Sequence, residues 1–134
     1  MRALRTRDHL FIRNYKPDRY PSGAPDGGQL GPYGDIDGSP TKDMYLRCRN
    51  HPAIRRYFDL ATALRPQVEL YDLRSDPEQL ENVAGSGGFE SVVAELSARL
   101  DQELKRLEDP RAMGQGNKFD AYPPPNLPLY RGTR

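Results

Sequence analysis

The sequence contains no tryptophan and one cysteine, Cys48, among its 134 residues. A single cysteine excludes a disulfide within the chain and says little about the compartment. No apolar run approaches the about 18 residues that a membrane-spanning helix needs, so we expect no contact with a membrane. The first residues are basic but lack the apolar core of a secretory signal, which favours a strand that begins inside a longer protein.

The formal net charge is only +1, which argues against a strongly basic nucleic-acid-binding protein. The charges are unevenly distributed along the chain. Residues 1–20 hold six basic and two acidic side chains, whereas residues 86–109 hold six acidic and three basic ones. We expect these two segments to attract one another, although the basic segment could instead face an anionic ligand.

Turn-forming residues are abundant, with 12 glycines and 13 prolines, and they predict a small ordered core with long connections. Alternating apolar and polar residues predict strands at 2–6, 9–15 and 68–73. Helices are predicted at 39–49, from Pro52 to before Pro66, and, as one short turn, at 78–83. The clearest element is an amphipathic helix at 89–108 with apolar residues on one stripe.

These elements predict an α+β domain, in which a small antiparallel sheet of three to four strands packs against one long C-terminal amphipathic helix. Two shorter helices and long loops complete it. We assign residues 1–109 to this domain, with a long loop at 16–39, and residues 110–134 to an irregular, proline-rich C-terminal arm.

No complete catalytic motif is found. The sequence has no phosphate-binding glycine loop, no nucleophile elbow and no His-Glu-x-x-His pair. Cys48 and His51 are three residues apart and could meet on a helix face, but His51 precedes Pro52 at a helix break, where capping is the favoured role. With two histidines in the chain, a zinc site would also need carboxylates.

The block Glu-Leu-Tyr-Asp-Leu-Arg-Ser-Asp-Pro-Glu-Gln-Leu-Glu-Asn-Val-Ala, at residues 69–84, resembles the C-terminal signature of the sulfatase family, within the alkaline-phosphatase-like superfamily. The family pattern differs mildly at Gln79 and Val83. Residues 2–14 resemble the opening hairpin of the same subdomain. Residues 33–42, with 109–111 and 119–123, are similar to the bacterial branch that resembles heparan N-sulfatase (N-sulfoglucosamine sulfohydrolase).

This resemblance implies a parent hydrolase that cleaves a sulfate ester or N-sulfate, using a formylglycine made from cysteine and a calcium ion. The family motif Cys-x-Pro/Ala-Ser/Gly-Arg does not match the sequence around Cys48. The resemblance therefore places the nucleophile and the metal ligands in a missing N-terminal catalytic domain, and we expect no catalytic residue, cofactor or metal site here.

By its position in the family, the loop at 34–42 is expected to form part of the rim of the substrate pocket. Asp35, Asp37, Thr41 and Lys42 could hydrogen-bond the hydroxyls of a sugar or its sulfate. The alternative is that the two aspartates only stabilise turns. The resemblance leaves the sulfated substrate of the parent and its native compartment open.

Two other functions are compatible with the sequence. One is a free-standing module that binds glycans or other anions, for which the supporting residues are Arg2, Arg5, Arg7 and Arg13. The other is a self-associating interaction module, because a sheet face that normally rests on a lost catalytic domain would be exposed as an apolar patch.

Overall fold

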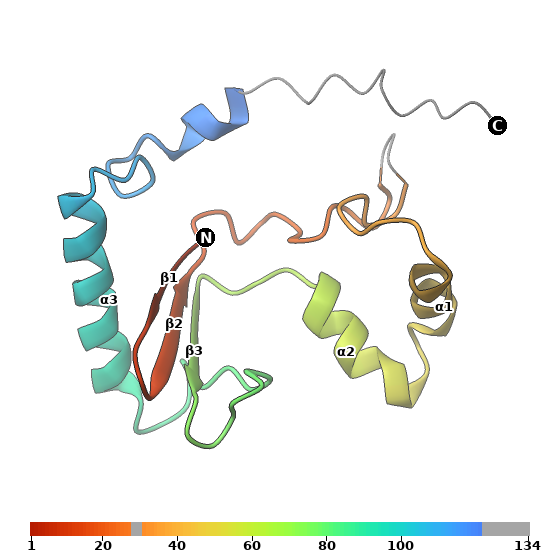
Figure 1. Cartoon of the computed structure of the whole chain (residues 1–134), viewed down its shortest axis with the longest axis horizontal. Coiled ribbons are helices and arrows are strands. Elements are labelled where there is room, and N and C mark those ends of the chain that lie inside the picture. The colour runs from red at the N-terminus through yellow and green to blue at the C-terminus, as the bar shows by residue number, and fades with distance from the viewer. Residues whose placement is uncertain (28–30, 122–134) are drawn as a thin grey trace.

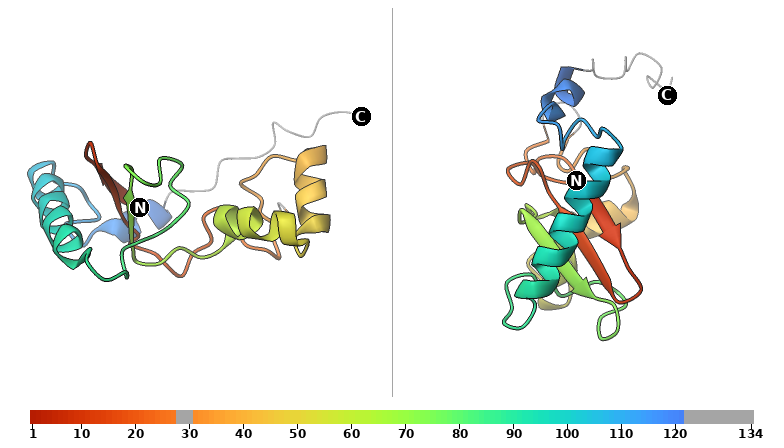
Figure 2. Two further views of the ribbon diagram at one scale, coloured as in Figure 1. Left: turned by 90° about the horizontal axis from the view of Figure 1, so that it is seen from below. Right: turned by 90° about the vertical axis from the view of Figure 1, so that its left-hand side faces the viewer.

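The computed structural model describes residues 1–27 and 31–121 and shows an α+β fold, as predicted (Figure 1). A three-stranded antiparallel sheet in the order β1-β2-β3 consists of β1 (Arg2–Arg5), β2 (His9–Arg13) and β3 (Val68–Asp72). Helix α3 (Glu90–Arg106) runs across one face of this sheet (Figure 2). Helices α1 (Pro40–Cys48) and α2 (Pro52–Thr62) lie apart from α3, beyond β3 (Figure 1).

The register of the sheet decides which side chains α3 covers. Leu4 lies opposite Phe11, and Phe11 lies opposite Leu70, so these three side chains share one face. The adjacent residues in the strands therefore point to the other face, where Leu10 lies opposite Tyr71. We call the face that carries Leu10, Ile12, Glu69 and Tyr71 the open face.

The core lies between the sheet and α3. Phe11 and Leu70 are fully buried, and they pack against three leucines of α3 that recur every four residues: Leu96, Leu100 and Leu104. This spacing places the leucines on one side of the helix, which confirms the predicted stripe. Leu107, which was assigned to the same stripe, is 61% exposed. It follows the last helical residue, so the chain has already turned away from the sheet.

Ion pairs join the basic N-terminal segment to the acidic C-terminal one, as the charge distribution predicted. The Nη2 atom of Arg2 lies 2.6 Å from Asp109. Arg13 pairs with Asp101 of α3 and also donates to Ser97. Burial disfavours ionisation of Asp109, but the hydrogen bond from Arg2 keeps its pKa below the ordinary value. Arg2 and Arg13 therefore serve the packing of α3.

Both short helices begin as predicted. The hydroxyl of Ser39 accepts a hydrogen bond from the amide of Lys42 at 3.1 Å, and Pro40 occupies the first helical position. At α2, the Nδ1 atom of His51 accepts from the amide of Ala53 at 3.3 Å. This confirms the capping role of His51.

The helical turn predicted at 78–83 is absent, which corrects that part of the sequence analysis. Gln79 has a φ of 60°, which no α-helix tolerates. The carboxylate of Asp76 accepts from the amides of Leu80 and Glu81, at 3.1 and 2.9 Å. These bonds, together with those from Asn82 to β3, hold the segment in a non-helical conformation.

The predicted loop at 16–39 contains no helix or strand in its described residues. Two backbone bonds fold it back on itself, from Tyr33 to Ala24 at 2.9 Å and from Asp35 to Ser22 at 3.3 Å. In the segment predicted to be irregular, a 3₁₀ helix, η2, forms at Gly116–Ala121. The proline-rich residues 122–134 lie outside the described part. No helix in residues 1–27 and 31–121 is long and apolar enough to cross a membrane.

Candidate functional site

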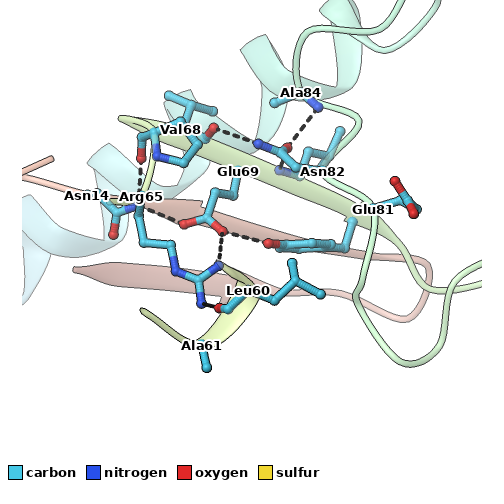
Figure 3. A network of polar contacts seen from close by, with 12 residues as sticks. Asn14, Leu60, Ala61, Arg65, Val68, Glu69, Glu81, Asn82 and Ala84 are labelled. Carbon is cyan, nitrogen blue, oxygen red and sulfur yellow. Dashed lines mark hydrogen bonds and ion pairs between the residues drawn. The ribbon is translucent and has the colours of Figure 1, made fainter. Parts of the chain in front are cut away.

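The block at residues 69–84 builds a polar cluster on the open face (Figure 3). Glu69 is only 4% exposed. One of its carboxylate oxygens accepts from the side-chain amide of Asn14 at 2.7 Å, and the other accepts from the hydroxyl of Tyr71 at 2.6 Å. Arg65 lies 4.0 Å from the same carboxylate. Burial and the bond to Glu69 raise the pKa of Tyr71, so its hydroxyl stays protonated at neutral pH.

Asn82 of the same block covers the outer edge of β3 (Figure 3). Its side-chain oxygen accepts from the amides of Leu70 and Ala84, at 2.9 and 3.0 Å, and its nitrogen donates to the carbonyl of Val68 at 3.3 Å. The amide of Val83 donates to the carbonyl of Leu70 at 2.8 Å. These bonds satisfy backbone groups that an edge strand otherwise leaves unpaired.

The turn after β3 is held by Asp72. Its carboxylate accepts two hydrogen bonds from the guanidinium of Arg74, at 2.9 and 2.7 Å, and one from the backbone amide of Arg74. The side-chain bond to Arg74 lowers the pKa of Asp72 to about 2. Glu69, Asp72 and Asn82 of the block thus each have structural partners within the chain.

A hollow of about 360 Å³ lies between α1, α2 and residues 33–39. Two of the four residues that we predicted for the pocket rim, Thr41 and Lys42, are found in its wall. The ammonium group of Lys42 donates to the carbonyls of Tyr33 and Ile36, at 3.0 and 2.7 Å. Lys42 therefore ties the loop to α1, and of its three N–H donors one remains for a ligand.

Asp35 and Asp37 do not line this hollow, and both are exposed. Within the described residues, neither side chain has a hydrogen bond or an ion pair to the protein. The structure therefore brings Thr41 and Lys42 together and leaves the two aspartates outside. Binding of a sugar by any of the four stays a prediction.

The aromatic residues of this hollow were not predicted from the sequence. Tyr33, Tyr45, Tyr57 and Phe58 line it, and we call it the aromatic hollow. The rings of Tyr33 and Phe58 meet edge to face, with 5.5 Å between their centroids. Tyr57 is 51% exposed. Tyr57 and Phe58 are adjacent in α2, an amphipathic helix. From the sequence, aromatic residues of a ligand site on such a helix are hard to distinguish from those of a packed core.

Metal-ligating side chains do not gather in the described part of the chain. Residues 1–27 and 31–121 contain no group of three or more His, Cys, Asp or Glu side chains that could hold a metal ion. Cys48 has a free thiol and is half-buried at the end of α1. The calcium ion and the formylglycine that the resemblance implies are tested by none of these observations.

Comparison with known proteins gives one informative similarity. Over 114 residues, the chain is 28% identical to an ulvan-active sulfatase from Formosa agariphila. The match covers 81% of this chain but only 17% of that protein. No family model matches the chain, and no solved structure matches it. The chain is similar to part of a sulfatase. This supports the resemblance at the level of sulfatases, without supporting the heparan N-sulfatase branch.

Proposed function

We propose that this chain is the C-terminal subdomain of a longer sulfatase-like hydrolase, in which it contributes packing and part of the rim of the substrate pocket. The observation that carries the proposal is the match that covers most of this chain and a small part of a sulfatase. The nucleophile, as formylglycine, and the calcium site would then lie in a preceding catalytic domain. Sulfate ester or N-sulfate hydrolysis would be an activity of the whole protein.

The polar residues of the block at 69–84 support a structural role for this chain, with the chemistry in the catalytic domain. Glu69, Asp72 and Asn82 are engaged in holding β3, the turn after it and its outer edge. Residues with these roles specify a fold, and they would be needed in a subdomain that takes no part in the chemistry.

The open face is the surface that we propose meets the catalytic domain. It carries Leu10, Ile12 and Tyr71, and together with Leu60 and Leu80 they line a continuous hollow beside the sheet. A second hollow of about 680 Å³ follows between the C-terminal end of α2 and β3. Helix α3 covers only the opposite face, and on the open face Leu10 and Ile12 remain half-buried beside the buried Tyr71.

The aromatic hollow is the part that we propose contributes to the substrate rim. Tyrosine rings offer flat apolar faces, and hydroxyl groups such as that of Thr41 offer hydrogen bonds, which together suit a sugar ring. Lys42 adds a positive charge that could pair with a sulfate group. Assignment to the heparan N-sulfatase branch rests on residues 33–42, 109–111 and 119–123 alone, and the ulvan-active relative lends it no support.

The upstream sequence and an activity assay test the proposal. The reading frame before Met1 should encode a Cys-x-Pro/Ala-Ser/Gly-Arg motif, and the longer protein should release sulfate from a sulfated oligosaccharide. The present chain assayed alone should release none. An upstream sequence without the motif, or sulfate release by this chain unaided, would contradict the proposal.

Kinetics of the longer protein test the rim. Tyr57→Ala should raise KM for a sulfated oligosaccharide with little change in kcat, because it removes a binding surface and no reacting group. Asp35→Ala and Asp37→Ala test the predicted aspartates in the same assay. Arg7→Gln, an exposed substitution at the hairpin turn, is the control. Unchanged kcat/KM in the Tyr57, Asp35 and Asp37 variants would show that neither the loop at 34–42 nor the aromatic hollow contributes to substrate binding.

A further inference from the structure

Four cationic residues line a further small hollow, near the junction of the N-terminal and C-terminal segments. Its volume is about 170 Å³, and its lining includes Lys16, Arg19, Arg65 and Arg111. We call it the basic hollow. It is several times the ~30 Å³ that one water molecule occupies in the liquid, so a small group fits and a large ligand does not. Asn14 and Tyr20 add polar groups to the wall.

The acids at this site are too few to neutralise the cations. Asp120 accepts two hydrogen bonds from the guanidinium of Arg19, at 2.6 and 2.9 Å, and lies 3.9 Å from the ammonium of Lys16. Glu69 lies 4.0 Å from Arg65. Within residues 1–27 and 31–121, no carboxylate forms an ion pair with Arg111. Asp18 also acts electrostatically on Arg19. Three carboxylates therefore lie near the four cations in the described residues, and Arg111 is the cation without an ion pair.

Among these four cations, Arg111 has the fewest partners in the described chain for its charge and its N–H donors. Its guanidinium lies 4.8 Å from the centroid of the Phe119 ring, and its Nε atom is buried without a hydrogen-bond partner. A buried donor without a partner costs about 1–3 kcal/mol. The hydrogen bond from Arg19, followed by the charges of Arg19, Lys16 and Arg111, keeps the pKa of Asp120 below the ordinary value. One carboxylate thus lies in the field of three cations.

We propose that the basic hollow binds a tetrahedral oxyanion, such as the sulfate half-ester of a sugar or a phosphate group. Arginine and lysine bind such groups through charge-assisted hydrogen bonds, and the planar fork of arginine matches two of their oxygens. An oxyanion here supplies a negative partner for Arg111, whose buried Nε atom has none among the described residues. The basic hollow is separate from the aromatic hollow, and this proposal does not depend on the proposed function.

An anion titration of the whole chain, followed by NMR spectra of the backbone amides and arginine Nε–H groups, tests this site. Sodium sulfate should shift the signals of Arg111 and its neighbours and reach saturation, whereas sodium chloride at equal ionic strength should not. Arg111→Gln should weaken the binding by about tenfold, the loss of one charge-assisted pair. Arg7→Gln removes an equal charge at the distant hairpin turn and should leave the affinity unchanged.

Lys16→Gln tests the same site if Arg111→Gln disturbs the fold, and circular dichroism of each variant shows whether it does. Methyl sulfate and inorganic phosphate distinguish the two sources of the group. Tighter binding of methyl sulfate supports a sulfated sugar as the ligand, and tighter binding of phosphate supports a phosphate-bearing one. NMR signals that shift without saturation in every salt overturn the proposal. An equal loss of sulfate affinity in Arg7→Gln, Arg111→Gln and Lys16→Gln overturns it as well.

Discussion

Glu69 shows how one residue of the sequence block is stabilised in a place where a carboxylate is costly. An isolated buried charge is strongly unfavourable. Here Asn14 and Tyr71 each donate a hydrogen bond to the carboxylate, and Arg65 supplies an opposite charge. The guanidinium of Arg65 is itself held by a bond to the carbonyl of Leu60, so the end of α2 is connected to the sheet through this cluster.

Replacing Glu69 with glutamine should destabilise the chain by about 1–3 kcal/mol. Glutamine has one acceptor oxygen and cannot accept from Asn14 and Tyr71 on separate oxygens, and Arg65 loses its counter-charge. Urea unfolding measures the change. Glu81→Gln is the matched control, because the side chain of Glu81 is 69% exposed and pairs only with exposed Arg56. We expect it to cost less than about 0.5 kcal/mol. Equal effects of the two substitutions would contradict the role of Glu69.

At the scale of elements, β3 depends on a side chain that stands in for a neighbouring strand. Asn82 both accepts from Leu70 and donates to Val68, which are two residues apart along the same edge. A residue with one acceptor and one donor at this position satisfies both backbone groups. Aspartate offers only the acceptor, and alanine offers neither.

The stability of variants at position 82 should follow the number of backbone groups of β3 that the side chain can bond. Asn82→Ala should lose about 1–3 kcal/mol because the amide of Leu70 is left without a partner, and Asn82→Asp should lose less. Hydrogen exchange of the Leu70 amide measures the effect directly, with fast exchange expected in the alanine variant and intermediate exchange in the aspartate variant. Unchanged protection in the alanine variant would show that Asn82 is not needed at this edge.

The attachment of α3 to the sheet makes a second prediction at this scale. Leu100 is 3% exposed in the centre of the core, so Leu100→Ala should cost about 2–5 kcal/mol through lost burial and a residual cavity. Leu107→Ala removes the same atoms from a side chain that is 61% exposed, and it should cost less than about 0.5 kcal/mol. Thermal or urea unfolding compares the two. Similar losses would mean that the helix continues further against the sheet than described.

At the scale of the whole molecule, the two faces of the sheet are covered unequally. Helix α3 and its leucines protect the face of Phe11 and Leu70, while α1 and α2 lie beyond β3 (Figures 1 and 2). On the open face, Tyr71 is buried, but Leu10 and Ile12 are only half-buried. This unequal cover is the physical basis for proposing that the face meets a catalytic domain.

The isolated chain should accordingly self-associate through its open face as concentration rises. Ile12→Gln should lower the apparent mass in light scattering, because it places a polar side chain in the centre of that face. Leu107→Gln changes an exposed leucine elsewhere and should leave the mass unchanged. A monomer at all concentrations, with little binding of a dye that detects apolar surface, would count against this prediction.

The sequence alone determined the elements whose signals are local. The alternation in 9–13, the cap and proline at Ser39 and Pro40, and the leucine stripe of α3 each depend on neighbours in the chain, and each was predicted within a few residues. The segment at 78–83 was predicted as a helical turn because its composition permits one. There, contacts with Asp76 and β3, which its composition does not specify, decided the conformation.

Tertiary structure alone decided which polar residues come together. Lys16 and Asp120 are far apart in the sequence and meet because the sheet and α3 bring the two ends of the chain to the same side. Asn14 and Glu69, also far apart, meet because β2 pairs with β3. Overall charge distribution predicted attraction between the ends, but it could not assign partners, since any cation attracts any anion at long range. Which arginines are neutralised and which retain unpaired charge depends on distances of a few ångströms, and those are set by the packed core.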